Sequence, residues 1–147
     1  SLSATFQRWL LDDGPFEFRY LHPRDEFEVA KRPPYQHVWF RLRDRIGDDP
    51  EQHRAMLAYA SDLHLIGTTM FPHGISYLQP NVMTASLDHA MWFHEAFRAD
   101  EWMLYAMDSP WAGHGRGMNR GSIFTRDGRL VASVAQEGLI RKREPRA

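Results

Sequence analysis

A single stretch of helical periodicity, flanked on both sides by strand-like stretches, constrains the fold of this 147-residue chain more than any other feature. Asp49 can cap the helix, Pro50 suits its first position, and Gln52 stands where a capping box places an amide. Apolar or small residues then recur at steps of four, three and four. This spacing places four residues on one helical face: Met56, Ala60, Leu63 and Gly67. We expect this helix to end before Pro72.

Strand-like patterns occupy most of the remaining chain. Apolar and polar residues alternate before the helix and again after Pro80, and Asp127-Gly128 is a hairpin turn signal. The expected strands are 16–20, 37–42, 82–94, 102–107, 117–125 and 130–141. A lone amphipathic helix must bury its apolar face, and a curved antiparallel sheet provides a surface for it. We therefore predict an α+β domain of the hotdog type, with an antiparallel β-sheet wrapped around one long central helix.

Composition narrows the functional classes. The 18 basic and 19 acidic residues nearly cancel, so the chain lacks the basic excess of a nucleic-acid-binding protein. It has no cysteine, which excludes disulfides, thiolate zinc sites and cysteine nucleophiles. No apolar run approaches the roughly 18 residues of a membrane helix, and the eight histidines lack the His-x-x-x-His pairing of a zinc protease. We expect a cytoplasmic domain with no nucleic-acid or membrane partner, no metal and no cofactor.

Three polar residues stand out because they occur in helical or strand-like surroundings. Asp62 falls near the C-terminal end of the expected helix, Ser86 lies within a strand-like run, and Gln136 lies in another strand that looks buried. Singly, each is explained by solvent exposure or a hydrogen bond to the backbone. Together, a carboxylate, a hydroxyl and an amide can hold one water molecule, with the carboxylate as general base. This set suits hydrolysis of an ester or a thioester without a covalent intermediate.

Several short sequence blocks follow one another in a specific order. The most specific are Asp-His-Ala-Met-Trp-Phe-His at 88–94 and Gln-Glu-Gly at 136–138. Further blocks are Leu-Ala-Tyr-Ala-Ser-Asp at 57–62, Pro-His-Gly-Ile at 72–75 and Glu-Trp-Met-Leu-Tyr at 101–105. With these blocks, the region from 16 to 141 resembles the C-terminal half of the acyl-CoA thioesterase II family, the double-hotdog thioesterases.

The resemblance implies a function and a site. The family hydrolyses acyl-CoA thioesters to a free fatty acid and coenzyme A, using water oriented by an Asp, a Thr or Ser, and a Gln. These positions fall on Asp62, Ser86 and Gln136, so this chain carries the serine form. Asp88, two residues from Ser86, is the competing carboxylate, and the resemblance gives it a structural role.

Four further residues are candidates for contact with the substrate. His89 is expected to support the site through hydrogen bonds, and Trp92 to line an acyl channel, although packing alone explains most of the aromatic residues. Arg116 and Gly117 end a glycine-rich basic loop whose backbone N–H groups could contact a phosphate of coenzyme A. A plain strand connection also explains this loop.

The resemblance also bears on domain organisation. We expect a linker-like helical segment at 1–14, a hotdog domain at 15–143 and a tail at 144–147. Because the family has two hotdog domains and a lone one exposes a long sheet edge, this chain should pair with a second hotdog domain. The two readings are a homodimer and a fragment whose N-terminal half has been removed, and the second is favoured.

Two other functions remain open. The first is a non-catalytic module that binds acyl-CoA or only dimerises. The second is a hotdog hydratase acting on enoyl thioesters, which needs an Asp followed about five residues later by a His. Asp62 and His64 have a different spacing, and the hydratase leaves Gln136 unexplained.

Overall fold

The fold rests on one antiparallel sheet. The computed structural model describes residues 14–23 and 29–143, so the expected segments at 1–14 and 144–147 lie, apart from Gly14, outside the described residues. The sheet order is β1-β2-β5-β6-β7-β3, and β4 also pairs with β7. The strands are β1 (Phe16–Tyr20), β2 (Tyr35–Leu42), β3 (Val82–Ser86), β4 (Ala90–Phe93), β5 (Met103–Gly113), β6 (Arg116–Thr125) and β7 (Leu130–Lys142).

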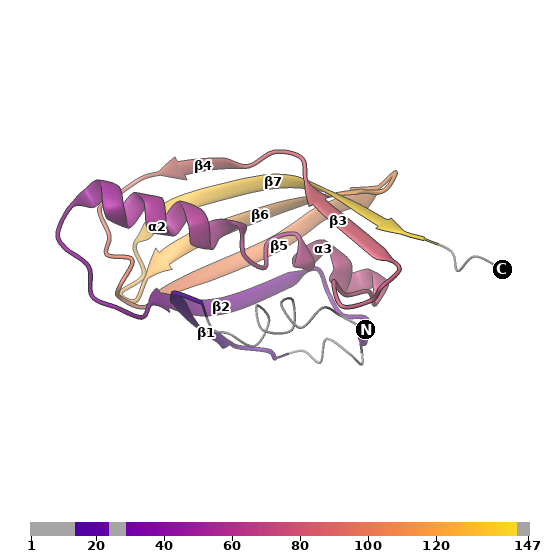
Figure 1. Cartoon of the computed structure of the whole chain (residues 1–147), viewed down its shortest axis with the longest axis horizontal. Coiled ribbons are helices and arrows are strands. Elements are labelled where there is room, and N and C mark those ends of the chain that lie inside the picture. Colours follow the sequence, from indigo (N-terminus) through magenta and orange to yellow (C-terminus); the bar gives the residue numbers. More distant parts are fainter. Residues whose placement is uncertain (1–13, 24–28, 144–147) are drawn as a thin grey trace.

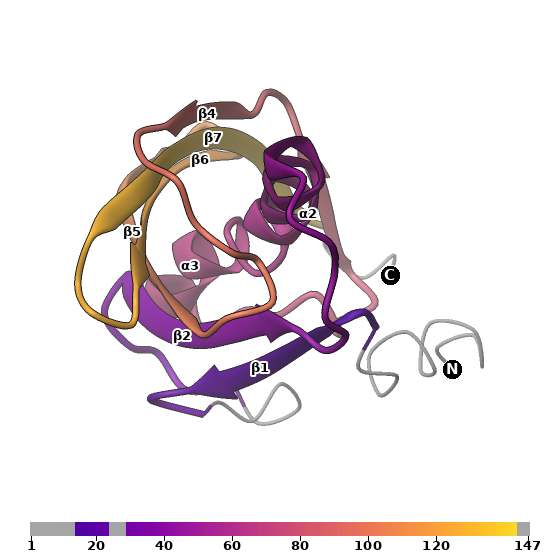
Figure 2. The same cartoon turned by 90° about the vertical axis from the view of Figure 1, so that its left-hand side faces the viewer.

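The sheet curls around the helices, as Figures 1 and 2 show. The central helix is α2 (Pro50–Asp62), followed by the short helix α3 (Gly67–Met70) and a 3-10 turn, η1 (Phe71–His73). Asp49 caps α2 as expected, since its carboxylate accepts a hydrogen bond of 3.0 Å from the Glu51 N–H. The predicted α+β hotdog fold is confirmed. Among the described residues, no helix has the length and apolar character needed to cross a bilayer.

The central helix is shorter than predicted, and of the predicted face Ala60 and Gly67 are buried as expected. It ends at Asp62, and His64 beyond it adopts a left-handed backbone with φ of 69°, which no helix can continue through. Met56 and Leu63 of the predicted face are only half-buried. The residues of α2 that are buried against the sheet are His53, Leu57, Ala60 and Ser61.

The strand predicted at 82–94 is two strands separated by a bulge. In β3, Ser86 pairs with Gly138 of β7, whereas in β4 Ala90 pairs with Ala135 of the same strand. Three residues, 87–89, therefore stand opposite the two residues 136–137 of β7. Such an insertion re-aims the side chains that follow it. Because of the bulge, side chains on either side of it can face the same residue of β7.

The core lies between α2 and the concave face of the sheet. Alternating residues of β2, β5 and β7 supply most of it, as expected for strands with one face buried. Fully buried members include Val38, Phe40, Leu57, Met103, Ile123 and Val131. Strand β5 runs to Gly113, beyond the predicted end at 107, and joins β6 through the tight turn at His114 and Gly115. The expected loop at 113–117 is thus a hairpin.

Candidate active site

The three polar residues singled out in the sequence meet at one place in the fold. Asp62 is the last residue of α2, Ser86 is the last residue of β3, and Gln136 lies in the middle of β7. The end of the helix is thereby placed next to the point where β3 leaves the sheet. The structure therefore brings together side chains that lie 24 and 50 residues apart in sequence.

Hydrogen bonds connect the three side chains in a row. The Gln136 amide Nε2 donates to the Ser86 hydroxyl oxygen at 2.5 Å. The Ser86 hydroxyl donates in turn to the Asp62 carboxylate oxygen Oδ1, with a longer separation of 3.4 Å. The amide has a second N–H and the carboxylate a second oxygen, so the row retains both a donor and an acceptor for a bound water molecule.

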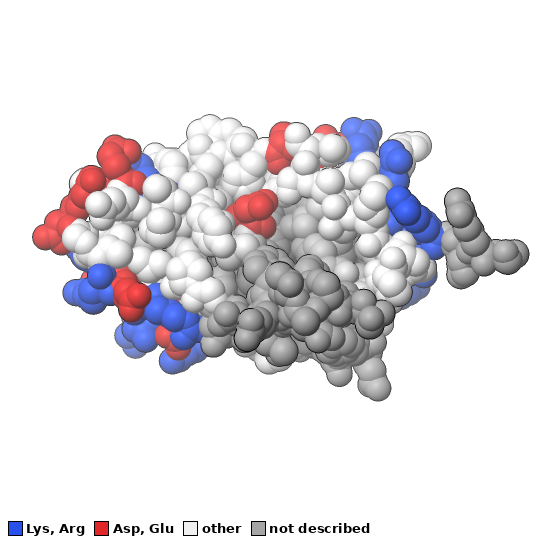
Figure 3. Space-filling model, in the orientation of Figure 1, with Lys and Arg blue, Asp and Glu red and all other residues white. Residues whose placement is uncertain are grey.

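Burial changes sharply along this row. Gln136 is fully buried, whereas the side chain of Asp62 is 57% exposed. The amide is therefore held by the protein, and the carboxylate faces the solvent. Figure 3 shows this face of the molecule, where an acidic residue is exposed near the middle and further charged residues gather towards the two ends.

His89 reaches the row from the bulge between β3 and β4. Its Nδ1 lies 2.7 Å from Oε1 of Gln136, and its Nε2 lies 2.8 Å from the hydroxyl of Ser61. Nδ1 is also 4.0 Å from Oδ1 of Asp62. The structure thus places this histidine in contact with the buried amide of the row.

Two further residues beside the site, Ser61 and Tyr105, lie within the sequence blocks noted above but were given no role there. Ser61 is fully buried on α2, and its backbone carbonyl accepts a 2.7 Å hydrogen bond from the hydroxyl of Tyr105. Burial raises the pKa of Tyr105 well above its usual range, so this hydroxyl stays protonated and donates. The contact ties the last turn of α2 to β5. Their contact with each other follows only from the structure, because the two residues are 44 positions apart in sequence.

Asp88, the competing carboxylate, has a backbone partner. Its Oδ1 accepts a 2.7 Å hydrogen bond from the N–H of Glu137, and the Leu87 N–H donates to the Glu137 carbonyl at 2.9 Å. Asp88 thereby stabilises the bulge, because it accepts a hydrogen bond from a β7 N–H at the point where the regular strand pairing is interrupted. This geometry fits the structural role expected for it.

The other predicted contact residues lie apart from the row. Trp92, on β4, is 54% exposed. Arg116 pairs with Glu137 at 2.6 Å, and its guanidinium lies 5.7 Å from the Trp111 ring. Gly117 is buried where a Cβ atom would stand 2.3 Å from Thr69, so it permits close packing of α3. Within the described residues, none of these three hydrogen-bonds to the Asp62–Ser86–Gln136 row.

A cavity of about 900 Å³ lies elsewhere, between the loops that follow β2, β4 and β6. Its lining includes Arg41, Arg43, Arg45, Arg98, Arg126 and Arg129, and no member of the hydrogen-bonded row. Asp100 also belongs to the lining, and its carboxylate is fully buried. No group of three or more His, Cys, Asp or Glu side chains suited to a metal ion occurs among the described residues.

Comparison with known proteins gives the family. A family model described as acyl-CoA thioesterase matches residues 12–139. Acyl-coenzyme A thioesterase 8 of Mus musculus is 45% identical over 128 residues, covering 86% of this chain and 39% of the mouse protein. Acyl-CoA thioesterase 2 of Haemophilus influenzae is 40% identical over 129 residues, covering 88% of this chain and 45% of that protein. This chain therefore spans less than half the length of these two relatives.

A solved structure agrees with these relatives. The crystal structure of an acyl-CoA thioesterase II, TesB2, from Mycobacterium marinum has a TM-score of 0.75 and is 43% identical, covering 92% of this chain and 52% of that one. The resemblance noted in the sequence is confirmed on this basis. Together with the hotdog fold, these matches show that the chain belongs to the acyl-CoA thioesterase family.

Proposed function

We propose that this chain hydrolyses acyl-CoA thioesters to a fatty acid and coenzyme A, with water oriented by Asp62, Ser86 and Gln136. The observation that carries the proposal is the hydrogen-bonded row from the buried amide, through the hydroxyl, to the exposed carboxylate. Family membership supplies the substrate class. The row supplies a base at a solvent-facing position and, next to it, a hydroxyl that is oriented by a buried amide.

The chemistry proceeds by direct attack of water. The Asp62 carboxylate accepts a proton from the bound water as the water oxygen forms a bond to the thioester carbonyl carbon. The tetrahedral intermediate then collapses, the C–S bond breaks, and the coenzyme A sulfur receives the proton that Asp62 had taken. The carboxylate is restored and no covalent acyl-enzyme forms. Ser86 and Gln136 keep the water in line, and Asp62 takes its proton from the water and not from Ser86.

Thiol release from a panel of short to long acyl-CoAs tests this proposal. We expect turnover by the wild-type chain, and a decrease in kcat of about 10²- to 10⁴-fold for Asp62→Asn, which removes the base and preserves the shape. Asp88→Asn is the matched control, because its amide oxygen can still accept from the Glu137 N–H. Unchanged hydrolysis in Asp62→Asn would overturn the assignment of the base.

The alternative function is a module that binds acyl-CoA without hydrolysing it. This chain covers only 39% and 45% of the length of two relatives, so part of what catalysis needs can lie outside it. Calorimetric titration with a non-hydrolysable acyl-CoA analogue separates the two. Binding with no thiol release by the folded chain would support the module and refute hydrolysis by this chain.

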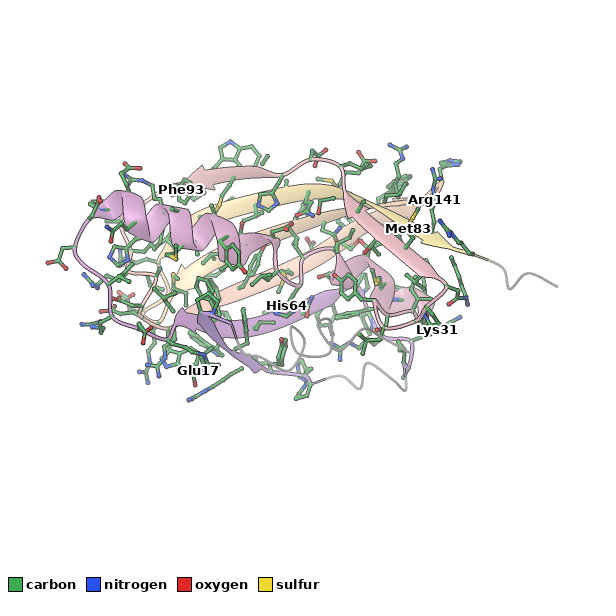
Figure 4. The ribbon with its side chains drawn as sticks, in the orientation of Figure 1. Glu17, Lys31, His64, Met83, Phe93 and Arg141 are labelled. Atoms are coloured by element: carbon green, nitrogen blue, oxygen red, sulfur yellow. The ribbon has the colours of Figure 1, made fainter. Side chains whose placement is uncertain are left out.

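We also propose that a second hotdog domain covers the edge formed by β3 and β4. Within the described residues, each of these strands pairs only with β7, which leaves one side of each unpaired. Large apolar side chains are exposed on or beside them, and Met83 and Phe93 can be followed in Figure 4. Exposed edges of this kind favour pairing with another chain or domain. Sedimentation of the chain at increasing concentration should reveal a dimer, and Trp92→Glu should weaken it.

A further inference from the structure

His89 hydrogen-bonds to Gln136, the fully buried end of the row. We propose that it is a positioning residue, which fixes the orientation of the Gln136 amide and thereby directs the hydroxyl proton of Ser86 towards Asp62. The inference rests on the proposed function, because it assigns His89 a role within the same site. The number of protons that each group can donate determines the direction of the row.

The amide of Gln136 has two possible orientations, and only one suits the carboxylate. With Nε2 towards Ser86, the amide donates to the hydroxyl oxygen, and the single hydroxyl proton is free to bind Asp62. With the amide turned by 180°, Ser86 must donate its proton to Oε1. Asp62 would then face a lone pair of the hydroxyl, and the contact would become repulsive.

His89 selects between these orientations through its Nδ1. At 2.7 Å from Oε1 of Gln136, this nitrogen must carry the proton of the hydrogen bond, because a carbonyl oxygen cannot donate. Turning the amide would place an N–H against this N–H. A histidine with a proton on Nδ1 therefore excludes the unproductive orientation, whether its ring is neutral or charged.

The Asp62 carboxylate favours a proton on Nδ1, and the Ser61 hydroxyl is compatible with it. The Ser61 hydroxyl lies 2.8 Å from Nε2 of His89 and 2.7 Å from the carbonyl of Ala58. It can donate to Nε2 of a neutral ring, or donate to Ala58 and accept from a charged one. Asp62 is 4.0 Å from Nδ1, and its negative charge favours a proton at that nitrogen.

The bulge makes the contact possible. In an unbroken strand, Ser86 and His89 would point to opposite faces of the sheet, since they are three residues apart. The extra residue in 87–89 turns His89 to the same face as Ser86, so both contact the one amide of Gln136. The row is thus directional: His89 donates to Gln136, Gln136 to Ser86, and Ser86 to Asp62.

Two substitutions of His89 separate this role from simple packing. The amide nitrogen of Asn is attached to Cγ, as Nδ1 of histidine is, whereas that of Gln is attached one carbon further out, as Nε2 is. His89→Asn therefore retains the donor to Gln136, and His89→Gln retains only the contact with Ser61. We expect kcat to fall about five- to tenfold in His89→Gln, as for one lost hydrogen bond, with KM changed less than twofold. His89→Asn should stay within about threefold of wild type.

An NMR measurement on the folded chain reports the orientation of the Gln136 amide directly. In the NMR spectrum, the side-chain NH₂ of Gln136, assigned from its absence in Gln136→Ala, should show a nuclear Overhauser effect to the β protons of Ser86. We expect this effect in the wild type and in His89→Asn, and its loss in His89→Gln. Equal effects and equal kcat values in the Asn and Gln variants would overturn the positioning role.

Failure of the inference and failure of the proposed function give different results. If Asp62→Asn loses turnover while His89→Gln keeps it, the triad stands and the role of His89 is refuted. If Asp62→Asn keeps its turnover, the proposed base is refuted. The Overhauser effect then still decides whether His89 orients Gln136, because it needs no turnover.

Discussion

Replacing Asp100 by Asn should lower the free energy of unfolding of this chain near neutral pH. The carboxylate of Asp100 is fully buried, and Arg98 binds it with two parallel hydrogen bonds, Nε to Oδ1 at 3.0 Å and Nη2 to Oδ2 at 2.9 Å. The N–H of Ile46 adds a third bond of 3.0 Å to Oδ2. These contacts join the loop after β2 to the loop before β5.

The pKa of Asp100 gives the size of this decrease in the free energy of unfolding. The hydrogen bonds from Arg98 lower the pKa of Asp100 from 3.8 to about 2. At about 1.4 kcal/mol per tenfold change in proton affinity, this difference corresponds to about 2 kcal/mol of stability. Because the folded-state pKa is the lower one, the contribution is present above pH 3.8 and is lost as the pH falls through about 2.

Urea unfolding at a series of pH values measures this contribution. We expect the wild type to exceed Asp100→Asn by about 2 kcal/mol at pH 6, and the difference to shrink below pH 4 as the wild-type carboxylate becomes protonated. Asp108→Asn is the matched control. Asp108 has the same paired contact with Arg120, but its side chain is 45% exposed, so its loss should have a much smaller effect. A pH-independent difference between wild type and Asp100→Asn would refute the reasoning.

Three shorter predictions follow from other contacts. Gly121→Ala should lower Tm, because its Cβ would stand 2.2 Å from the Tyr105 ring and would displace the hydroxyl that holds α2; differential scanning calorimetry checks this. Ser86→Thr should keep kcat/KM within about threefold, since it retains one hydroxyl, whereas Ser86→Ala should lose at least tenfold. Burial lowers the pKa of His64 from 6.5 to about 4. The stability that neutral His64 contributes should therefore be lost as the pH falls from 6.5 to about 4. His64→Asn, which tolerates the left-handed backbone, should lack that loss in pH-dependent unfolding.

Local sequence signals predicted the features that depend on neighbouring residues. Asp49 and Pro50 mark the start of α2 correctly because a cap and a first helical position act within one turn. Asp127 and Gly128 lie in the turn between β6 and β7, where Gly128 has φ of 92°. The three members of the hydrogen-bonded row were also chosen from the sequence, and the structure places them together.

Features that depend on distant partners could not be predicted. The bulge at 87–89 exists because its backbone and the Asp88 side chain bond to Glu137, about fifty residues away. The end of α2 is likewise set by a long-range contact, since Gln36 on β2 donates to the His64 carbonyl at 3.1 Å. His89 was expected near the site, but its contact with Gln136 follows only from the bulge.

The long sequence separations within the hydrogen-bonded row bear on how the proposed site forms during folding. Its contacts span 24, 47 and 50 residues, so no early helix or hairpin can contain them. Non-local strand pairings close slowly, because the entropy of the intervening chain is lost before the contacts form. During refolding from urea, helical circular dichroism should therefore recover first. Thioester hydrolysis should return only with the slow phase in which β3 joins β7, which makes turnover a reporter of sheet closure.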